Sequence, residues 1–533
     1  MRLEIAKTPA LLVILMACAS GVPEPLPQLG RFHFPTGMDI DVPYSPDAGR
    51  RARFLYIAGN SNFDQAASRG VVMAVDLDGY GPPATGLVPP GMVDDGGWDG
   101  TPLSFPDVGD AGTVDPAVGW VYTDSLGGEL RLVPTSAGGE RVLLATRAQN
   151  RLAFIDVDAG ALSCVGGDGG RDCLDDTSSP PLVVYGQNGG NQILDVFSVS
   201  PPVRANLAGG GEGPPEVFVG HLRNISTAVE GVFGVPANPY SSVSTPTSLT
   251  NVSAYIVRQN VDDPTCRMAE PIGTVPAAGV VGVPSPSGLF TVATGRFIGA
   301  SPANVQVMSL PPPTCPPPPP PAGEVSVDPT PPTPNLIDLS QILKETDGRA
   351  LALSTNGDRV FALSIGPDAI VILRIDGKAP GSLNIHPSTV VSVPTGPSEL
   401  LPIPRTRPDG RAVGDLVAIT CPGSEVLAFY DDELGMVTAA LPGVGDEPFA
   451  VVSAPRTLGN GPGATILPGV RLFVSAFGSG QVAVVDVPNL MDATTARVIA
   501  LLGSYEDTTA SPVNPLTSQI LTLPYGYSGS PGI

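Results

Sequence analysis

Charged side chains, aromatic rings and histidines are scarce in this chain of 533 residues, whose formal net charge is −23 at pH 7. Charged residues make up 15% of the chain and aromatic residues 5%. No segment is rich in Lys and Arg, which disfavours nucleic acid and anionic lipid headgroups as partners. The three histidines (His33, His221 and His386) are far apart in the sequence, and no CxxC pair occurs. We therefore expect no metal centre and no cofactor.

Catalytic signatures and helical periodicity are also missing. The chain has no GxSxG, HExxH, phosphate-binding or dinucleotide-binding motif. Two tryptophans, Trp98 and Trp120, offer little stacking surface for a quinone or a glycan. In place of helical patterns there are short runs of Val, Leu, Ile and Ala between turns, and 64 glycines and 62 prolines. This composition predicts an all-β fold with many loops.

Residues 1–17 have the features of a signal peptide. Arg2 and Lys7 precede a short apolar run over 11–16, which is too short to span a bilayer because a span takes about 20 apolar residues. The run ends in Leu15-Met16-Ala17-Cys18, which resembles the lipobox of bacterial lipoproteins.

That resemblance implies cleavage before Cys18 and lipidation of its thiol and amino group, so that two or three acyl chains hold the protein in a membrane. Ala19 follows the cysteine, and by the same resemblance a residue other than Asp implies sorting to the outer membrane. Residues 18–30 would be a lipidated tether rich in Pro and small residues. We expect the protein at the outer membrane, on its periplasmic face or at the cell surface.

A pair of strand patterns recurs seven times along the chain. The first pattern is an apolar run that ends in a small or polar residue, and the second alternates and often ends in Asp, as in 471–476 and 482–487. The first strands begin at residues 54, 142, 217, 289, 360, 416 and 472. The 56 to 88 residues between starts leave room for a four-stranded propeller blade in each repeat, since blades take about 40–50 residues.

The repeats at 54–76, 142–157 and 472–487 resemble the YVTN-type β-propeller repeats of bacterial and archaeal envelope proteins. We predict a seven-bladed β-propeller over residues 31–525 with a C-terminal tail at 526–533. The competing folds are a pair of β-sandwiches and a β-helix, and the irregular spacing disfavours the β-helix. Residues 311–334, which include six consecutive prolines, are predicted to be a stiff loop between blades.

Ring closure requires the two ends of the propeller to meet. Residues 32–34 and 38–40 near the start and 520–523 near the end are candidates for completing one blade together. Deletion of 518–533 would then lower the stability.

The chain has six cysteines, so five remain if Cys18 is lipidated. Cys164 and Cys173 flank a short loop, and a disulfide between them is plausible in an oxidising compartment. Cys266 and Cys315 could pair in the same way, which leaves Cys421 as the expected free thiol. Pairing cannot be read from sequence alone, so other connectivities stay open.

Aspartates close the second strand of five repeats: Asp76, Asp156, Asp376, Asp431 and Asp486. Because they recur once per repeat, we interpret them as turn caps that accept backbone N–H groups, not as catalytic acids. The acidic loop 168–176 could supply oxygen ligands to Ca²⁺, but it lacks EF-hand spacing, and a solvated loop is favoured.

The sequence thus predicts a membrane-anchored lipoprotein whose propeller is a non-enzymatic binding or scaffold module for a protein or a cell-envelope polymer. The alternative is a propeller hydrolase or lyase that acts on an extracellular or periplasmic substrate. A third possibility is an electron-transfer quinoprotein. Three or more titratable side chains that meet at the axis of the ring would favour the enzyme.

Overall fold

The structure is a computed structural model of the whole chain. It describes residues 32–46, 49–59, 69–79, 103–105, 119–124, 127–146, 151–166, 170–175, 179, 183–185, 191–206, 212–226, 255–264, 266–271, 280–285, 290–295, 304–309, 335–339, 342–343, 347–377, 383–458 and 463–503. The predicted signal peptide (1–17), the tether with Cys18, the Pro-rich loop 311–334 and the tail 526–533 lie outside these residues. None of the helices in the described part is long and apolar enough to cross a membrane.

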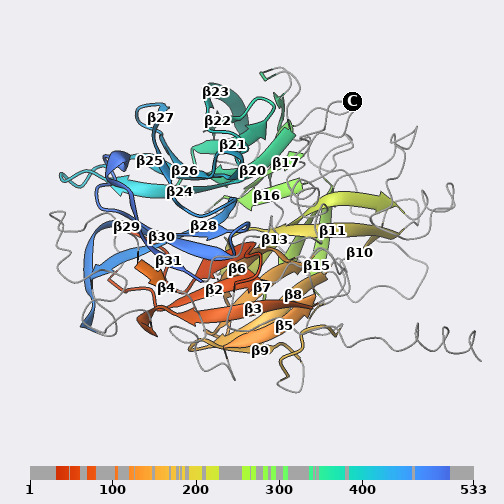
Figure 1. Cartoon of the computed structure of the whole chain (residues 1–533). Coiled ribbons are helices and arrows are strands. Elements are labelled where there is room, and N and C mark those ends of the chain that lie inside the picture. Colours follow the sequence, from red (N-terminus) through yellow and green to blue (C-terminus); the bar gives the residue numbers. More distant parts are fainter. Residues whose placement is uncertain are drawn as a thin grey trace, which may run out of the picture.

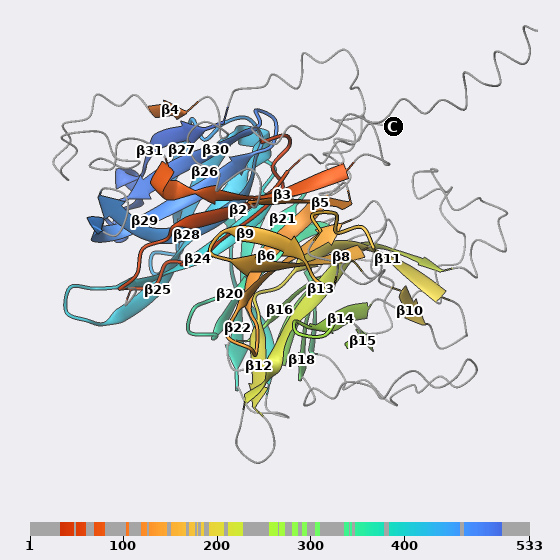
Figure 2. The same cartoon turned by 90° about the horizontal axis from the view of Figure 1, so that it is seen from below.

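The fold is an all-β propeller, as predicted, built from antiparallel sheets arranged about a common centre (Figures 1 and 2). The first sheet has the order β1-β2-β3-β5, with bounds Gly37–Ile40, Phe54–Gly59, Arg69–Asp76 and Trp120–Asp124. The second sheet has the order β6-β7-β8-β9, with bounds Gly127–Pro134, Glu140–Thr146, Arg151–Asp158 and Ala161–Cys164.

The third sheet has ten strands and follows the main path β10-β11-β13-β16-β17-β18-β19. Its strands have the bounds Val183–Tyr185, Asn191–Val199, Glu212–Ser226, Val280–Pro284, Phe290–Gly295, Asn304–Ser309 and Asn335–Asp338. Off this path, β12 and β14 pair with β13, and β15 pairs with β14; their bounds are Val203–Asn206, Tyr255–Asn260 and Arg267–Pro271.

Three more sheets complete the propeller. The order β20-β21-β22-β23 has the bounds Asp347–Leu353, Arg359–Ile365, Ala369–Asp376 and Asn384–Ser392. The order β24-β25-β26-β27 has the bounds Glu399–Thr406, Ala412–Cys421, Val426–Asp431 and Met436–Pro442. The last sheet, β28-β29-β30-β31-β4, has the bounds Pro448–Leu458, Thr465–Ala476, Gln481–Val487, Arg497–Leu502 and Leu103–Phe105. Short 3₁₀ helices lie at Leu77–Gly79, Pro422–Ser424 and Ala493–Thr495.

All seven predicted strand pairs form antiparallel hairpins, namely β2–β3, β7–β8, β13–β14, β17–β18, β21–β22, β25–β26 and β29–β30. They are distributed over six sheets, because β13–β14 and β17–β18 share the ten-stranded sheet. The all-β propeller is therefore confirmed, whereas the count of seven blades is not.

Packing between neighbouring sheets explains why the central strands are mostly apolar. Every residue of β30 is buried, including the polar Gln481 and Asp486, because neighbouring blades cover both faces of the sheet. Within the described residues, six hydrophobic clusters each join one sheet to the next. One of them holds Met38 and Leu55 of the first sheet against Phe473 and Leu502 of the last, which closes the ring.

In the described residues, the two ends of the ring meet by packing between the first and the last sheet. Strand β1 pairs with β2 in its own sheet and contacts β28 of the last sheet. A blade completed jointly by 32–34, 38–40 and 520–523 stays a prediction, because 520–523 lies outside the described residues. Strand β4, from the long connection after β3, runs parallel to β31 and adds a fifth strand to the last sheet (Figure 2).

Candidate functional site

The recurring aspartates bind arginines more than they cap turns, which corrects the sequence interpretation. Asp486 is buried and accepts hydrogen bonds from Nε of Arg456 at 2.8 Å and from Nε of Arg471 at 2.7 Å. Burial alone would raise the pKa of Asp486, but Arg471 and then Arg456 outweigh burial and hold its pKa below the usual value. Asp156 pairs with Arg141, and the exposed Asp376 lies 3.5 Å from Arg374.

Asp431 both pairs with an arginine and caps a turn. Its carboxylate accepts both terminal nitrogens of Arg405, at 2.7 and 2.8 Å, and the backbone N–H groups of Glu433 and Leu434. The predicted turn cap is thus confirmed here, as it is at Asp76, which accepts the N–H of Asp78. Burial would raise the pKa of Asp431, but these hydrogen bonds and the charge of Arg405 lower it. Asp431 therefore holds the turn that follows β26 through its backbone hydrogen bonds, and Arg405 holds Asp431 in place.

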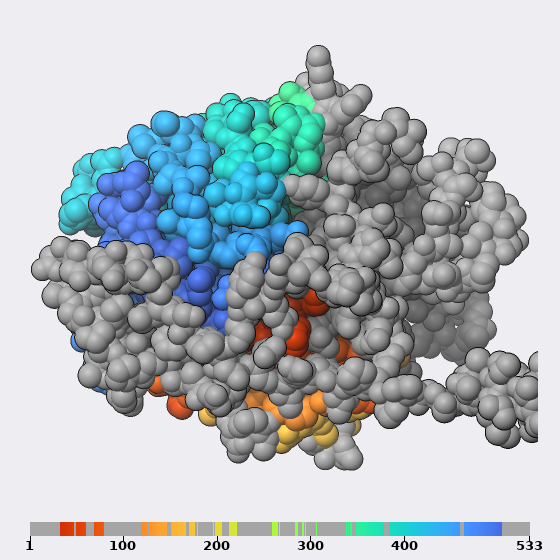
Figure 3. Space-filling view, viewed as in Figure 1, coloured from red at the N-terminus to blue at the C-terminus, as the bar shows by residue number. Residues whose placement is uncertain are grey.

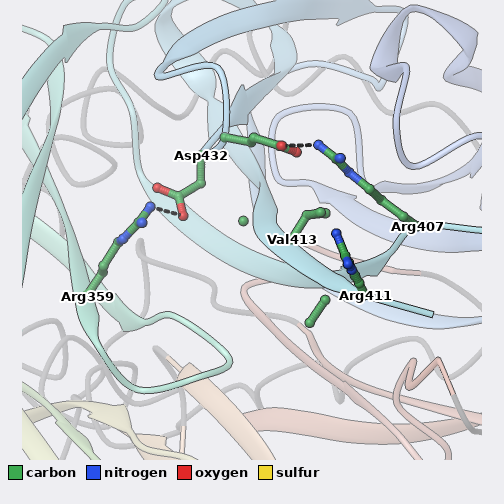
Figure 4. A pocket seen from close by; sticks show the side chains of 8 residues that line it. Arg359, Arg407, Arg411, Val413 and Asp432 are labelled. Carbon is green, nitrogen blue, oxygen red and sulfur yellow. Dashed lines mark hydrogen bonds and ion pairs between the residues drawn. The ribbon is translucent and has the colours of Figure 1, made fainter. Parts of the chain in front are cut away.

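That turn forms one wall of a pocket of about 370 Å³ (Figure 4). The pocket is lined by Arg359, Arg407, Arg411, Ala412, Val413, Gly414, Asp432 and Glu433. Asp432 pairs with Arg359 of β21, and Glu433 pairs with Arg407. Burial raises the pKa of Asp432, although Arg359 counteracts the rise.

The opposite wall is the tip of the β24–β25 hairpin, which projects from the molecule (Figures 1 and 3). Pro408, Asp409 and Gly410 form its turn: Gly410 has a φ of 82°, its N–H donates to the Arg407 carbonyl, and the Arg407 N–H donates to the Arg411 carbonyl. Pro, Asp and Gly each favour such a turn. The turn sets Arg407 and Arg411 at the two ends of the tip, on the same side of the pocket as seen in Figure 4.

Gly414 lets the two walls approach each other. A Cβ atom there would lie 2.9 Å from the backbone nitrogen of Glu433 and 3.0 Å from a carboxylate oxygen of Asp432. Its carbonyl also accepts a 2.6 Å hydrogen bond from Nε of Arg405. A side chain at this position would therefore push the two walls of the pocket apart.

A second polar group lies on the inner strands of the ring. Asp39 of β1, Glu129 and Arg131 of β6 and Glu399 of β24 interact electrostatically with one another. The side chains of Glu129 and Arg131 each keep 21% of their surface accessible and lie 3.7 Å apart. We call these four residues the axial cluster.

The axial acids are bonded to the backbone of the neighbouring inner strand. Asp39 accepts the N–H of Leu132 in β6 at 2.8 Å, and Glu129 accepts the N–H of Val199 in β11 at 3.2 Å. Glu399 accepts a backbone N–H from Val451 of β28. The carboxylates thus link successive inner strands by the same kind of bond.

Burial raises the pKa of all three axial acids. The pKa of Glu399 is raised to about 8 because burial and then the neighbouring Glu129 disfavour its charge. In the described part of the chain, no three His, Cys, Asp or Glu residues are grouped closely enough to hold a metal ion.

Two predictions about the cysteines are confirmed, the disulfide between Cys164 and Cys173 and the free thiol at Cys421. Cys164 and Cys173 form a disulfide, and Cys421 is a buried free thiol whose pKa burial raises to about 12. Cys266 is disulfide-bonded to a cysteine outside the described residues, so its pairing with Cys315 stays a prediction.

The acidic loop that Cys164 and Cys173 enclose packs on the neighbouring sheet. Its Asp172 lies 2.8 Å from Arg69, and Arg171 stacks over the ring of Trp120 at 4.7 Å. The ends of the loop, at Asp168 and Asp176, lie outside the described residues. Asp172 is therefore paired with an arginine, and the preference for a solvated loop over a Ca²⁺ site stays a prediction.

Sequence reasoning missed both polar groups. The arginine pocket escapes a search for basic segments, because Arg359 comes from one sheet and Arg407 and Arg411 from the next, 48 and 52 residues later in the numbering. The axial acids lie on the innermost strands, which are outside the recurring strand pairs of the repeats. An alignment that included residues 37–40, 127–134 and 399–406 would show an acid near the start of each.

No protein-family model matches the chain, and no curated protein matches it. Among solved structures it is similar to the periplasmic gluconolactonase of Pseudomonas aeruginosa, at 15% identity over 75% of this chain and 83% of that chain, with a TM-score of 0.35. It is also similar to the hydrazine synthase of Kuenenia stuttgartiensis, at 11% identity over 88% and 98%, with a TM-score of 0.40. A Lactobacillus plantarum protein matches at 10% identity over 73% and 83%, with a TM-score of 0.38. No activity follows from similarities this weak.

Proposed function

We propose that the chain is an exported lipoprotein, held at the outer membrane by lipidated Cys18, whose propeller binds a protein or a cell-envelope polymer without catalysis. The anchor rests on the sequence Leu15-Met16-Ala17-Cys18 behind a short apolar run. The net charge of −23 keeps such a domain soluble and disfavours nucleic acid as the ligand.

One observation favours a non-catalytic role for the axial acids: each accepts a backbone N–H of the neighbouring inner strand. Acids in this arrangement link the blades, and the charged groups at the edge of the propeller are then available for recognition. Propellers commonly carry their binding groups on loops over a rigid ring.

We also propose that the ring has seven blades of the YVTN repeat type. The ten-stranded sheet supports this count, because β11-β13-β14-β15 and β16-β17-β18-β19 are each a four-stranded antiparallel run. The two runs are joined at the single residue pair His221 and Val280. The inner strands β1, β6, β11, β16, β20, β24 and β28 each contact the next around the ring.

The binding role is tested by capture from envelope extracts. Protein without the lipidated cysteine (residues 19–533) is immobilised through its N-terminus, and bound material is identified by mass spectrometry and by sugar analysis. We expect one protein or polymer to be retained intact and released by salt. Recovery of cleaved fragments of that ligand would contradict the non-enzymatic proposal.

The second candidate function, a hydrolase or lyase, is favoured by the meeting of three acids in the axial cluster and above all by Glu399. A carboxyl with a pKa of about 8 is protonated at neutral pH and can serve as a general acid. If the axial cluster is catalytic, Glu399→Gln abolishes cleavage of the captured ligand while the ligand still binds. If the acids are links between blades, as we propose, Glu399→Gln leaves capture unchanged and no cleavage is seen in either protein.

A further inference from the structure

We propose that the pocket between the β24–β25 hairpin and the turn after β26 binds an oxyanion group, such as a phosphate, sulfate or carboxylate carried by a larger ligand. The site is a binding function of its own and does not depend on the lipid anchor. Three guanidinium groups line it, from Arg359, Arg407 and Arg411, and the chain as a whole carries a net charge of −23.

Arg411 is the cation with the most donors to offer. Its side chain is 83% exposed, and its nearest acid is Asp409, at 3.8 Å from Nε. In the described part of the chain, the guanidinium of Arg411 makes no hydrogen bond. In Figure 4, no dashed line reaches Arg411, whereas Arg359 and Arg407 are each bonded to a carboxylate.

The two acids in the pocket hold the other arginines in place and leave the lining positive. Asp432 binds one terminal nitrogen of Arg359, and Glu433 binds one terminal nitrogen of Arg407. A guanidinium has five N–H donors, so each of these arginines keeps donors for a ligand. The lining has three positive and two negative side chains, and Asp358 and Asp409 lie 3.9 and 3.8 Å from Arg359 and Arg411. The unused guanidinium donors, and not a large positive charge, would therefore bind the ligand.

The chemistry of arginine identifies the ligand class. The planar fork of a guanidinium donates two parallel hydrogen bonds to a carboxylate, phosphate or sulfate, and it remains charged at every physiological pH. The Pro-Asp-Gly turn and the cap provided by Asp431 hold the two walls before any ligand arrives. A pre-formed site loses less conformational entropy on binding.

Calorimetric titration of the mature propeller with inorganic phosphate and, separately, with acetate tests the site, with ionic strength held constant by NaCl. We expect saturable binding of at least one of them, and the preferred anion tells whether a tetrahedral or a planar group is recognised. Arg411→Gln should lower the affinity about tenfold, because a charge-assisted hydrogen bond is lost. Glu433→Gln should raise the affinity, because it removes a negative charge and frees Arg407.

The matched control is Arg374→Gln, which removes an arginine that is 65% exposed and pairs with Asp376 outside the pocket. The affinity of Arg374→Gln for the anion should equal that of the wild type. The proposal is overturned if neither anion binds saturably, if Arg411→Gln binds as well as the wild type, or if Arg374→Gln weakens binding as much as Arg411→Gln does. Weaker binding by Glu433→Gln would contradict an anionic ligand.

Discussion

Two adjacent aspartates, Asp431 and Asp432, form ion pairs on opposite sides of the chain, one in the interior of the propeller and one in the pocket. Asp431 faces inward and binds Arg405, and their side chains are 7% and 0% exposed, whereas Asp432 faces the pocket and binds Arg359, and theirs are 4% and 38% exposed. The chemical groups are the same on both sides. Burial raises the pKa of Asp432 more than Arg359 lowers it, whereas for Asp431 the hydrogen bonds from Arg405 and from two turn N–H groups outweigh burial and lower the pKa.

The difference shows how one type of ion pair serves two purposes. A buried pair cannot exchange its partner for water, so loss of either member leaves a charge without compensation in the interior. In a pair with one exposed member, such as Arg359 with Asp432, water solvates the arginine when the acid is lost, so the cost to stability is smaller. We therefore expect inward-facing pairs to determine the stability and pocket-facing pairs to determine binding.

Asp486→Asn should have the largest effect on folding. It leaves Arg456 and Arg471, with side chains 2% and 5% exposed, without their shared carboxylate. We expect a loss of about 3–5 kcal/mol in the free energy of unfolding, measured by urea denaturation. The matched control is Asp376→Asn, at the equivalent position of another repeat but 54% exposed, for which a change within about 0.5 kcal/mol is expected. Equal losses in the two variants would remove the distinction between interior and surface.

Gly414→Ala should have an intermediate effect. The added Cβ would lie 2.9 Å from the Glu433 backbone nitrogen, so the wall of the pocket must move. We expect a loss of about 1–3 kcal/mol in urea denaturation, together with weaker anion binding. The control is Gly410→Asn, in the same hairpin, where nothing lies within 4 Å of a Cβ atom and Asn tolerates the positive φ. A Gly414→Ala protein with unchanged stability and affinity would show that the walls are not in tight contact.

The pH dependence of stability should have opposite signs for two groups of acids. The raised pKa of Glu399 means that the folded state holds a proton which the unfolded state releases above its ordinary pKa of 4.5, so stability falls as the pH rises from 4.5 to about 8. The lowered pKa values of Asp431 and Asp486 stabilise the fold above their ordinary value of 3.8, and this contribution is lost as the pH falls below it.

Glu399→Gln should therefore flatten the decline in the free energy of unfolding between pH 4.5 and 8 and leave the acid limb unchanged. Urea denaturation across this pH range measures both limbs. A decline as steep in Glu399→Gln as in the wild type would show that the axial cluster does not carry the raised pKa.

Arg411→Gln should have the smallest effect on folding, because its side chain is mostly solvated. We expect the free energy of unfolding to change by no more than about 0.5 kcal/mol. The same urea series used for Asp486→Asn measures it. A loss of several kcal/mol would mean that Arg411 belongs to the structural set and that its effect on anion binding is indirect.

The hairpins of the repeats could be predicted from sequence, because each consists of local apolar runs such as 472–474 and 482–485 that are buried on both faces. The Cys164–Cys173 disulfide was foreseeable for the same reason, since it closes a short loop. The pocket and the axial cluster were not, because each brings together residues from different sheets. The arginine partners of Asp431 and Asp486 also come from other strands, so their aspartates resembled simple turn caps.

Membrane fractionation of the full chain and of Cys18→Ala, expressed in a Gram-negative host, tests the central claim of an anchored propeller most directly. We expect the wild type in the membrane pellet, resistant to salt and released by detergent, and Cys18→Ala in the soluble periplasmic fraction with the same urea midpoint as the detergent-released wild type. A Cys18→Ala protein that stays in the detergent-soluble membrane fraction, or a wild type found in the soluble fraction, would contradict it.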